Sequence, residues 1–145
     1  MQFSTTLRTN RAANIETTIG TAPILRVFAV AAGSVPANCG AASAGTILVE
    51  MTLPSDWATQ ASGVLSLSGT WQDSSANATG TGRYFRVFDS TGATCHIQGT
   101  VSITSGSGEL KFNAPDAGGA DAGLPAFVSG QAVTISSFTI TEGGA

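Results

Sequence analysis

The sequence predicts an all-β fold: an antiparallel two-sheet sandwich, jelly-roll-like, that follows a short N-terminal arm and helix. Segments rich in Val, Ile, Thr and Phe recur along the chain, and each is bounded by Gly, Pro, Ser or Asp. No helical pattern separates these segments, which favours strands that pair directly with one another. A chain of 145 residues is typical of a single domain and is long enough to bury a substantial core. An immunoglobulin-like sandwich is the second choice.

Residues 1–22 are expected to form the arm and the helix. The helix is predicted in the stretch TNRAANIETTIG, where Thr9 or Asn10 can accept a hydrogen bond from a free backbone N–H of the first turn. Gly20 is a typical C-terminal end for such a helix. Residues 1–8 are expected to be extended. A helix this short is unstable alone, so we expect it to lie on another part of the protein.

Residues 23–145 are expected to form the β-sandwich domain. In the closing segment AVTISSFTIT, apolar residues alternate with polar ones, and the Ser136–Ser137 step changes the phase, which predicts a β-bulge there. The stretch SGSG at 105–108 predicts a turn between two strands, and long Gly/Ala-rich loops are expected at 31–45 and 72–82. The predicted strands are Ile24–Val30, Thr46–Leu53, Val64–Ser68, Arg83–Asp89, Cys95–Thr104, Glu109–Phe112, Ala126–Val128 and Ala132–Thr141.

Cys39 and Cys95 are the only cysteines, and His96 is the only histidine. Adjacent residues of a strand point to opposite faces, so Cys95 and His96 cannot converge on one metal ion or one substrate atom. Two alternatives stay open for the cysteines: each is a small buried apolar residue, or Cys39 contacts Cys95. A repeated pattern favours the contact, because LRVFAVAAGSVPANCG and FRVFDSTGATCHIQG each lead from a similar strand through a loop to a cysteine.

Charge and composition exclude several classes of function. Charged residues make up 10% of the chain, against about 25% in an ordinary soluble domain. The positive charges form no stripe, so we expect the chain to bind neither nucleic acid nor an anionic membrane surface. No phosphate-binding glycine loop, nucleotide fingerprint, zinc-ligand spacing or Ser-His-Asp arrangement is present, which favours a protein that is not an enzyme and holds no metal or cofactor. A weakly charged surface instead favours a protein packed against other proteins.

Four stretches resemble small structural proteins of tailed bacteriophages and prophages, and most of all the capsid cement, or head-decoration, proteins. They are MQFSTTLRTNRAANIETTIGTAPILRVF, LPSDW, YFRVFDSTGATCHIQGTV and VTISSFTITEGGA. The resemblance covers nearly the full length, and its motifs concern the fold and not catalysis. It implies a jelly-roll-like β-domain that docks on the outside of an assembled capsid, bridges neighbouring major capsid proteins and stabilises the head. It supplies no catalytic residues.

The expected location and partners follow from this resemblance. The opening residues MQFSTTLRTNR lack the apolar stretch of a signal peptide, so we expect folding in the host bacterial cytoplasm, with both cysteines starting as thiols. Assembly would then place the protein on the capsid exterior of the virion. The expected partners are the major capsid protein and further copies of this chain, with a homodimer favoured over a trimer. The residues expected to contact a partner are Phe3, Leu7, Arg8 and Arg11 of the arm, and Ile15 and Ile19 of one helix face.

Three other functions stay open as alternatives. A virion-displayed carbohydrate-binding or adhesion module would use Trp57, Trp71 or Tyr84 as stacking surfaces, although both tryptophans are expected at the edge of the core with the indole N–H bonded to the backbone. A tail structural protein is a further alternative. An enzyme that uses Cys39 or Cys95 with His96 is the least favoured.

Overall fold

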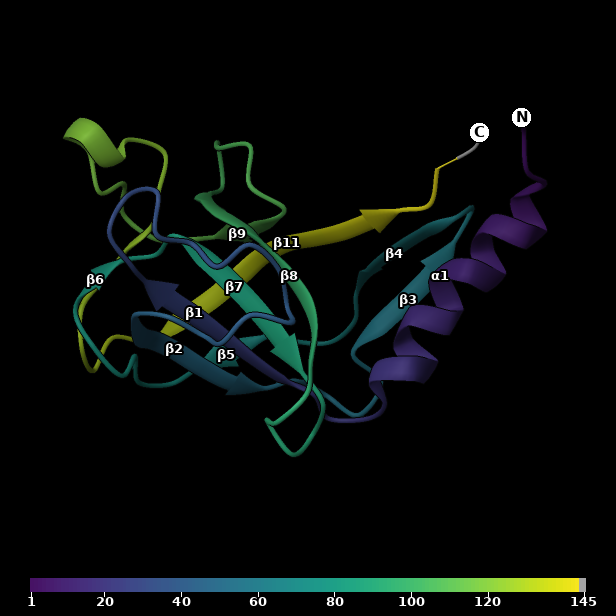
Figure 1. The fold of residues 1–145 in the computed structure, drawn as a ribbon, viewed down its shortest axis with the longest axis horizontal. Helices are drawn as coiled ribbons and strands as arrows, with labels where there is room; N and C mark the ends of the chain where they lie inside the picture. Colours follow the sequence, from purple (N-terminus) through teal and green to yellow (C-terminus); the bar gives the residue numbers. More distant parts are fainter. Residues whose placement is uncertain (144–145) are drawn as a thin grey trace.

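A curled sheet and one N-terminal helix make up most of the molecule (Figure 1). The structure, a computed structural model, describes residues 1–143. It confirms the predicted all-β class, because strands far outnumber helical segments in this part of the chain. The elements are α1 (Thr5–Ile19), β1 (Ile24–Ala29), β2 (Thr46–Thr52), β3 (Ala58–Ala61), β4 (Val64–Leu67), β5 (Gln72–Asp73), β6 (Gly80–Thr81), β7 (Tyr84–Phe88), β8 (Cys95–Ile103), β9 (Leu110–Phe112), the 3-10 turn η1 (Gly119–Asp121), β10 (Ala126–Phe127) and β11 (Val133–Thr141).

The main sheet has the strand order β2-β1-β7-β8-β9-β11-β4-β3, and β5 also pairs with β11. A second sheet contains only β10 and β6. The small sheet packs on the large one through Phe127 and Phe112, whose rings meet edge to face with centroids 5.2 Å apart. The architecture is therefore a curled mixed sheet with a small second sheet against it.

One strand pair departs from the predicted antiparallel arrangement, because β8 and β9 are parallel, with Val101 beside Leu110. The predicted turn at 105–108 does not form a hairpin. Instead the loop doubles back along β8, and its glycines make this possible. A Cβ on Gly108 would lie 2.6 Å from the carbonyl carbon of Val101, and one on Gly106 would lie 2.6 Å from the Cβ of Ser102. Only a backbone without side chains can approach β8 this closely.

All eight predicted strands are present, each within one residue of its expected bounds. The predicted bulge is also confirmed, because the register between β11 and β9 shifts between Ile135 and Ser137. Three strands were not predicted. The β3 segment ATQA has a single β-branched residue, Thr59, and no aromatic residue, and β5 and β6 are two-residue strands within the stretch expected to be a loop at 72–82. Their pairing depends on neighbours in the fold and not on local pattern.

The helix begins earlier than predicted. Ser4 is its N-cap, and the Ser4 hydroxyl accepts a hydrogen bond from the backbone N–H of Leu7 at 3.2 Å. The predicted caps Thr9 and Asn10 lie inside the helix, and residues 5–8, half of the expected extended arm, are helical. Ser4 can accept from a free backbone N–H of the first turn as well as Thr9 or Asn10 can. No Gly or Pro lies between Ser4 and these residues, so the helix extends back to Ser4. The predicted end at Gly20 is confirmed.

The core lies inside the curve of the main sheet and continues under α1. Trp57 and Trp71 are fully buried within it, with ring centroids 6.0 Å apart. Each indole N–H donates to a backbone carbonyl, from Trp57 to Gly20 and from Trp71 to Ser68, both at 3.1 Å. The predicted backbone bonds are therefore present, while the burial is deeper than the core edge expected for these rings.

Candidate binding surface along helix α1

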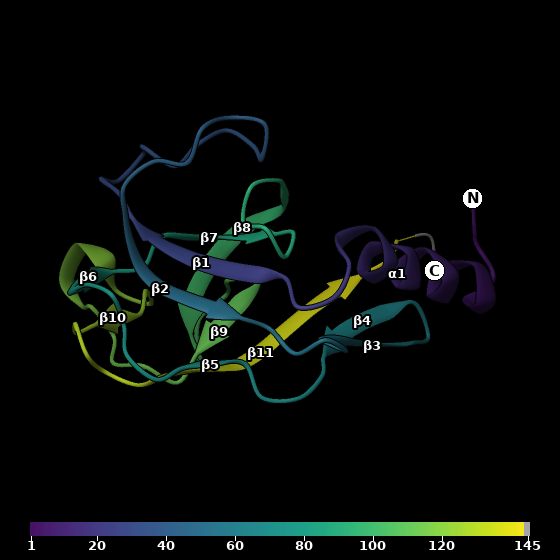
Figure 2. The same ribbon diagram turned by 90° about the horizontal axis from the view of Figure 1, so that it is seen from below.

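Helix α1 is fixed on the β3–β4 hairpin at one end of the molecule (Figure 2). Its mean hydropathy is low, and Ala12 and Ile19 are its two fully buried residues. At the hairpin turn, the backbone N–H of Gly63 donates to the Thr9 hydroxyl at 3.0 Å. The helix is thus held by contacts along its length, as expected for an element too short to be stable alone.

The predicted partner-contact residues divide into buried and accessible ones. Ile19 is only 5% exposed and belongs to the core cluster, so its expected place on an exposed helix face is wrong. The helix turns this side chain onto the sheet, because an apolar residue at the last turn gains more from burial there than from exposure. Ile15 is half-buried and packs against the same cluster. Leu7 is 45% exposed and lies near the free end of the helix.

The two predicted arginines of this segment have defined positions. The Arg11 guanidinium forms an ion pair with Glu142, 3.0 Å away, and its central carbon lies 5.3 Å from the centre of the Phe3 ring. The arm is therefore folded back on the helix and does not extend into solvent. The Arg8 stem crosses the hairpin turn, where a Cβ on Gly63 would lie 2.7 Å from the Cβ of Arg8. These contacts order Phe3, Arg8 and Arg11 before any partner binds.

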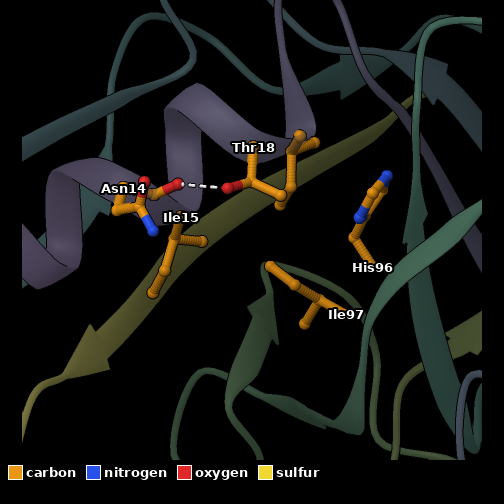
Figure 3. Close-up of a pocket in the computed structure, with 6 residues that line it drawn as sticks. Asn14, Ile15, Thr18, His96 and Ile97 are labelled. Carbon is orange, nitrogen blue, oxygen red and sulfur yellow. Dashed lines mark hydrogen bonds between the residues drawn. The ribbon is translucent and has the colours of Figure 1, made fainter.

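A pocket of about 210 Å³ separates the last turns of α1 from the start of β8 (Figure 3). Ile15 and Thr18 line it on the helix side, and His96 and Ile97 face them from β8. The Thr18 hydroxyl donates to the backbone oxygen of Asn14, as the dashed line in Figure 3 shows. Over residues 1–143, no group of three or more His, Cys, Asp or Glu side chains comes together as a metal site would require.

Cys39 and Cys95 form a disulfide, so of the two alternatives for these residues the structure shows the contact. The bond ties the β1–β2 loop (30–45) to the start of β8. It also occupies both thiols, and a nucleophile that acts with His96 would need one of them free.

The Arg86 side chain holds the β1–β2 loop in place by hydrogen bonds, a role that the sequence did not predict. Its side chain is 1% exposed, and the guanidinium donates to the backbone oxygens of Asn38 and Ala41, both at 2.9 Å. It also donates to the Ser43 hydroxyl and to the Gln98 side chain. Four oxygen acceptors compensate the buried charge without a carboxylate. The signal in the sequence was an arginine inside the apolar run YFRVF.

The three aromatic residues expected to stack on a sugar are buried and are not presented at the surface. Trp57, Trp71 and Tyr84 are each at most 1% exposed. The Tyr84 hydroxyl donates to the backbone oxygen of Ala44 at 2.7 Å, and its ring stacks on Phe28 with centroids 4.8 Å apart. The three rings named for a carbohydrate-binding module therefore have structural roles in this fold.

Two carboxylates with altered pKa values stabilise turns. The hydrogen bond from the Thr91 hydroxyl, helped by those from the backbone N–H groups of Ala93 and Thr94, lowers the pKa of Asp89 to about 2 against the opposing effect of desolvation. Asp89 thereby organises the β7–β8 turn. Burial works against ionisation of Glu109, but hydrogen bonds from the Thr100 hydroxyl and N–H outweigh it and hold the pKa of Glu109 below its usual value.

Comparison with known proteins adds no family assignment. No protein-family model, no curated protein and no solved structure matches this chain. Within the described part of the chain, α1 is the one α-helix, and it lacks the length and the apolar character needed to cross a bilayer. The surface around α1, formed by Phe3, Leu7, Arg8, Arg11 and Ile15, is the candidate that the structure supports best for contact with a partner.

Proposed function

We propose that this chain is a non-enzymatic structural protein of a phage virion, which binds the outside of the capsid and cements neighbouring major capsid proteins. The single observation that carries the proposal is the preordered surface of α1. Leu7 is exposed there beside Arg8 and Arg11, whose side chains are already fixed by contacts within the chain. A preordered surface loses little conformational entropy on binding.

Two further features support the same role. The resemblance of the sequence to cement proteins covers nearly the whole chain, and the low content of charged residues reduces repulsion between crowded copies. A repeated lattice also converts weak single contacts into strong attachment, because several copies or contacts act together. The proposal includes a homodimer in preference to a trimer. The proposal also includes a jelly-roll-like fold, whose two layers are the curled sheet and the small β6–β10 sheet.

The disulfide is compatible with assembly in a bacterial cytoplasm. There Cys39 and Cys95 remain reduced, and the bond forms after the particle leaves the cell. Arg86, Gln98 and Tyr84 already hold the β1–β2 loop in place by hydrogen bonds, so oxidation fixes an existing arrangement. This sequence of events lets the protein fold first and gain its covalent link in the environment where the virion must survive.

The test is binding to purified capsids that lack the protein. Leu7→Asp places a charge at the centre of the α1 surface and is expected to weaken capsid binding about tenfold or more, since it replaces an apolar contact with a carboxylate that must lose its water at the interface. Val128→Asp is the matched control, because Val128 is also an exposed apolar residue, 58% accessible, and follows β10 at the opposite end of the molecule (Figure 2). The control variant should bind like the wild type.

The outcome also separates the alternatives. Purified particles should contain this chain in numbers comparable to the major capsid protein. A few copies confined to the tail would favour a tail structural protein and contradict the proposal. Equal binding of both variants and the wild type would show that another surface meets the capsid.

A further inference from the structure

The main sheet has a break between β8 and β11. The intervening strand β9 is only three residues long and pairs with β8 over residues 101–103 and with β11 over 135–138. Residues 97–99 of β8 and 139–141 of β11 line one pocket beyond the end of β9, and no strand of the described chain pairs with both of them there. In Figure 1, β11 turns away from β8 beyond β9. We call the space between these two segments the strand slot.

The edges of the strand slot carry backbone groups that point into it. The N–H of Thr100 is directed to this side of β8, because it donates to the Glu109 carboxylate at 2.6 Å. Backbone groups two residues apart in a strand point the same way, so the N–H and C=O of Gln98 face the slot as well. On the opposite edge, residues 139–141 pair with 64–66 of β4 on their far side only. Such edges are completed by an added strand.

The floor of the strand slot is apolar. Phe85, Ile97, Phe138 and Ile140 line a pocket of about 250 Å³ there. Gly99 keeps it open, since a Cβ at this position would lie 2.7 Å from the Phe85 ring. Ile97, labelled in Figure 3, also lines the pocket beside α1, so the two pockets share this side chain. A strand in the slot would place every second side chain on this floor.

One end of the strand slot carries a negative charge. Glu109 is the single charged residue among those that line the slot. Its Oε2 atom accepts both hydrogen bonds from Thr100, while its Oε1 atom accepts none within the described structure. The carboxylate is thus held at the slot with one oxygen available for a cation.

We propose that the strand slot binds an extended peptide segment of a partner protein, with apolar side chains at alternate positions and a Lys or Arg beside Glu109. The segment is about three residues long, since residues 97–99 of β8 and 139–141 of β11 are those that line the slot, and each strand residue advances about 3.3 Å. This mode is β-strand addition, in which backbone bonds provide affinity and alternate side chains provide specificity.

The shape and chemistry of the slot favour an extended peptide over other occupants. A helix, about 10 Å in diameter, satisfies its backbone groups within itself and cannot pair with an open strand edge. A sugar would gain little, because the tryptophan rings are buried. The inference concerns β8, β11 and Glu109 and not the α1 surface, so it holds or fails independently of the capsid proposal.

The test begins with a displayed library of random seven-residue peptides selected on the full wild-type chain. The expected consensus alternates apolar residues and contains one Lys or Arg. A synthetic consensus peptide should then shift the amide NMR signals of Gln98 and Thr139.

Glu109→Gln keeps an oxygen that accepts from Thr100 but removes the charge, and should weaken peptide binding about fivefold. Glu50→Gln on β2 is the matched control and should leave the affinity unchanged.

A second variant tests the floor of the slot. Ile140→Asp should abolish measurable binding, and its fold is checked by the amide signals of β1 and β2, which lie away from the substitution. Absence of a consensus, signals that shift elsewhere, or equal binding by Glu109→Gln and the wild type would each overturn the proposal. Concentration-dependent self-association that Ile140→Asp removes would also overturn it, since the occupant would then be a second copy of this chain.

Discussion

Removal of the disulfide is expected to destabilise the protein by an amount that follows from its position in the chain. Cys39 and Cys95 are separated by 56 residues. A cross-link that closes a loop of this length lowers the entropy of the unfolded chain by about 14 cal/mol/K, which corresponds to about 4 kcal/mol at 25 °C. The double variant Cys39→Ser with Cys95→Ser should therefore lose about this much free energy of unfolding. The corresponding fall in melting temperature is about 13 °C for a chain of this size.

The native fold should nevertheless persist without the bond. Arg86 donates to Asn38 and Ala41, and Gln98 donates to Pro36, so the β1–β2 loop keeps its position on the sheet. Near-ultraviolet circular dichroism should thus be the same for the variant and the wild type. The reduced wild type, treated with a non-thiol reductant, should have the same stability as the variant.

Urea denaturation with and without the reductant measures this effect directly. The wild type should show two midpoints, one for each redox state, and the double variant should show a single midpoint under both conditions. A difference below about 1 kcal/mol would refute the loop-closure reasoning. Loss of the native circular dichroism signal on reduction would refute the role assigned to Arg86.

Two further predictions concern single residues. Arg86→Met should lower the free energy of unfolding by about 3 kcal/mol, because the carbonyl oxygens of the β1–β2 loop lose a buried charged donor. Urea denaturation measures this loss. An unchanged midpoint would mean that the disulfide alone holds the loop. Asp89 has a folded-state pKa of about 2, below the ordinary 3.8, so its stabilising effect is present above pH 4 and is lost as the pH falls through about 2. NMR titration of the Asp89 carboxyl should give this low value, and an ordinary pKa would contradict the hydrogen bonds assigned to the turn.

Local pattern predicted most of the strands and some of the details of their pairing. The alternation in AVTISSFTIT and its break at Ser136–Ser137 follow from the two-residue period of a strand, and the register shift in β11 confirms them. The end of α1 at Gly20 was also predictable, since glycine readily adopts the positive φ of 85° found there. In each of these cases, neighbours in the sequence determine the conformation.

Features that depend on distant residues could not be predicted. The parallel pairing of β8 with β9 depends on the close approach of Gly108 to Val101, which looks like an ordinary hairpin turn in the sequence. The Arg11–Glu142 ion pair joins the two ends of the described chain. For the candidate site, Leu7 and Arg11 are exposed, whereas Arg8 is half-buried. The burial of Ile19 could not be foreseen, because it depends on where the β3–β4 hairpin lies.

Strand β11 has a consequence for how binding affects the whole protein. At its start, Val133 pairs with Asp73 of β5, and at its end, Thr141 pairs with Val64 of β4, beneath the helix. One continuous strand therefore contributes to both the curled sheet and the hairpin that supports α1. The helix end cannot separate without disturbing the centre of the sheet. If a partner binds α1 as proposed, the free energy gained there would be shared by thermodynamic linkage with the entire fold, and a bound copy would resist unfolding at sites that the partner never touches.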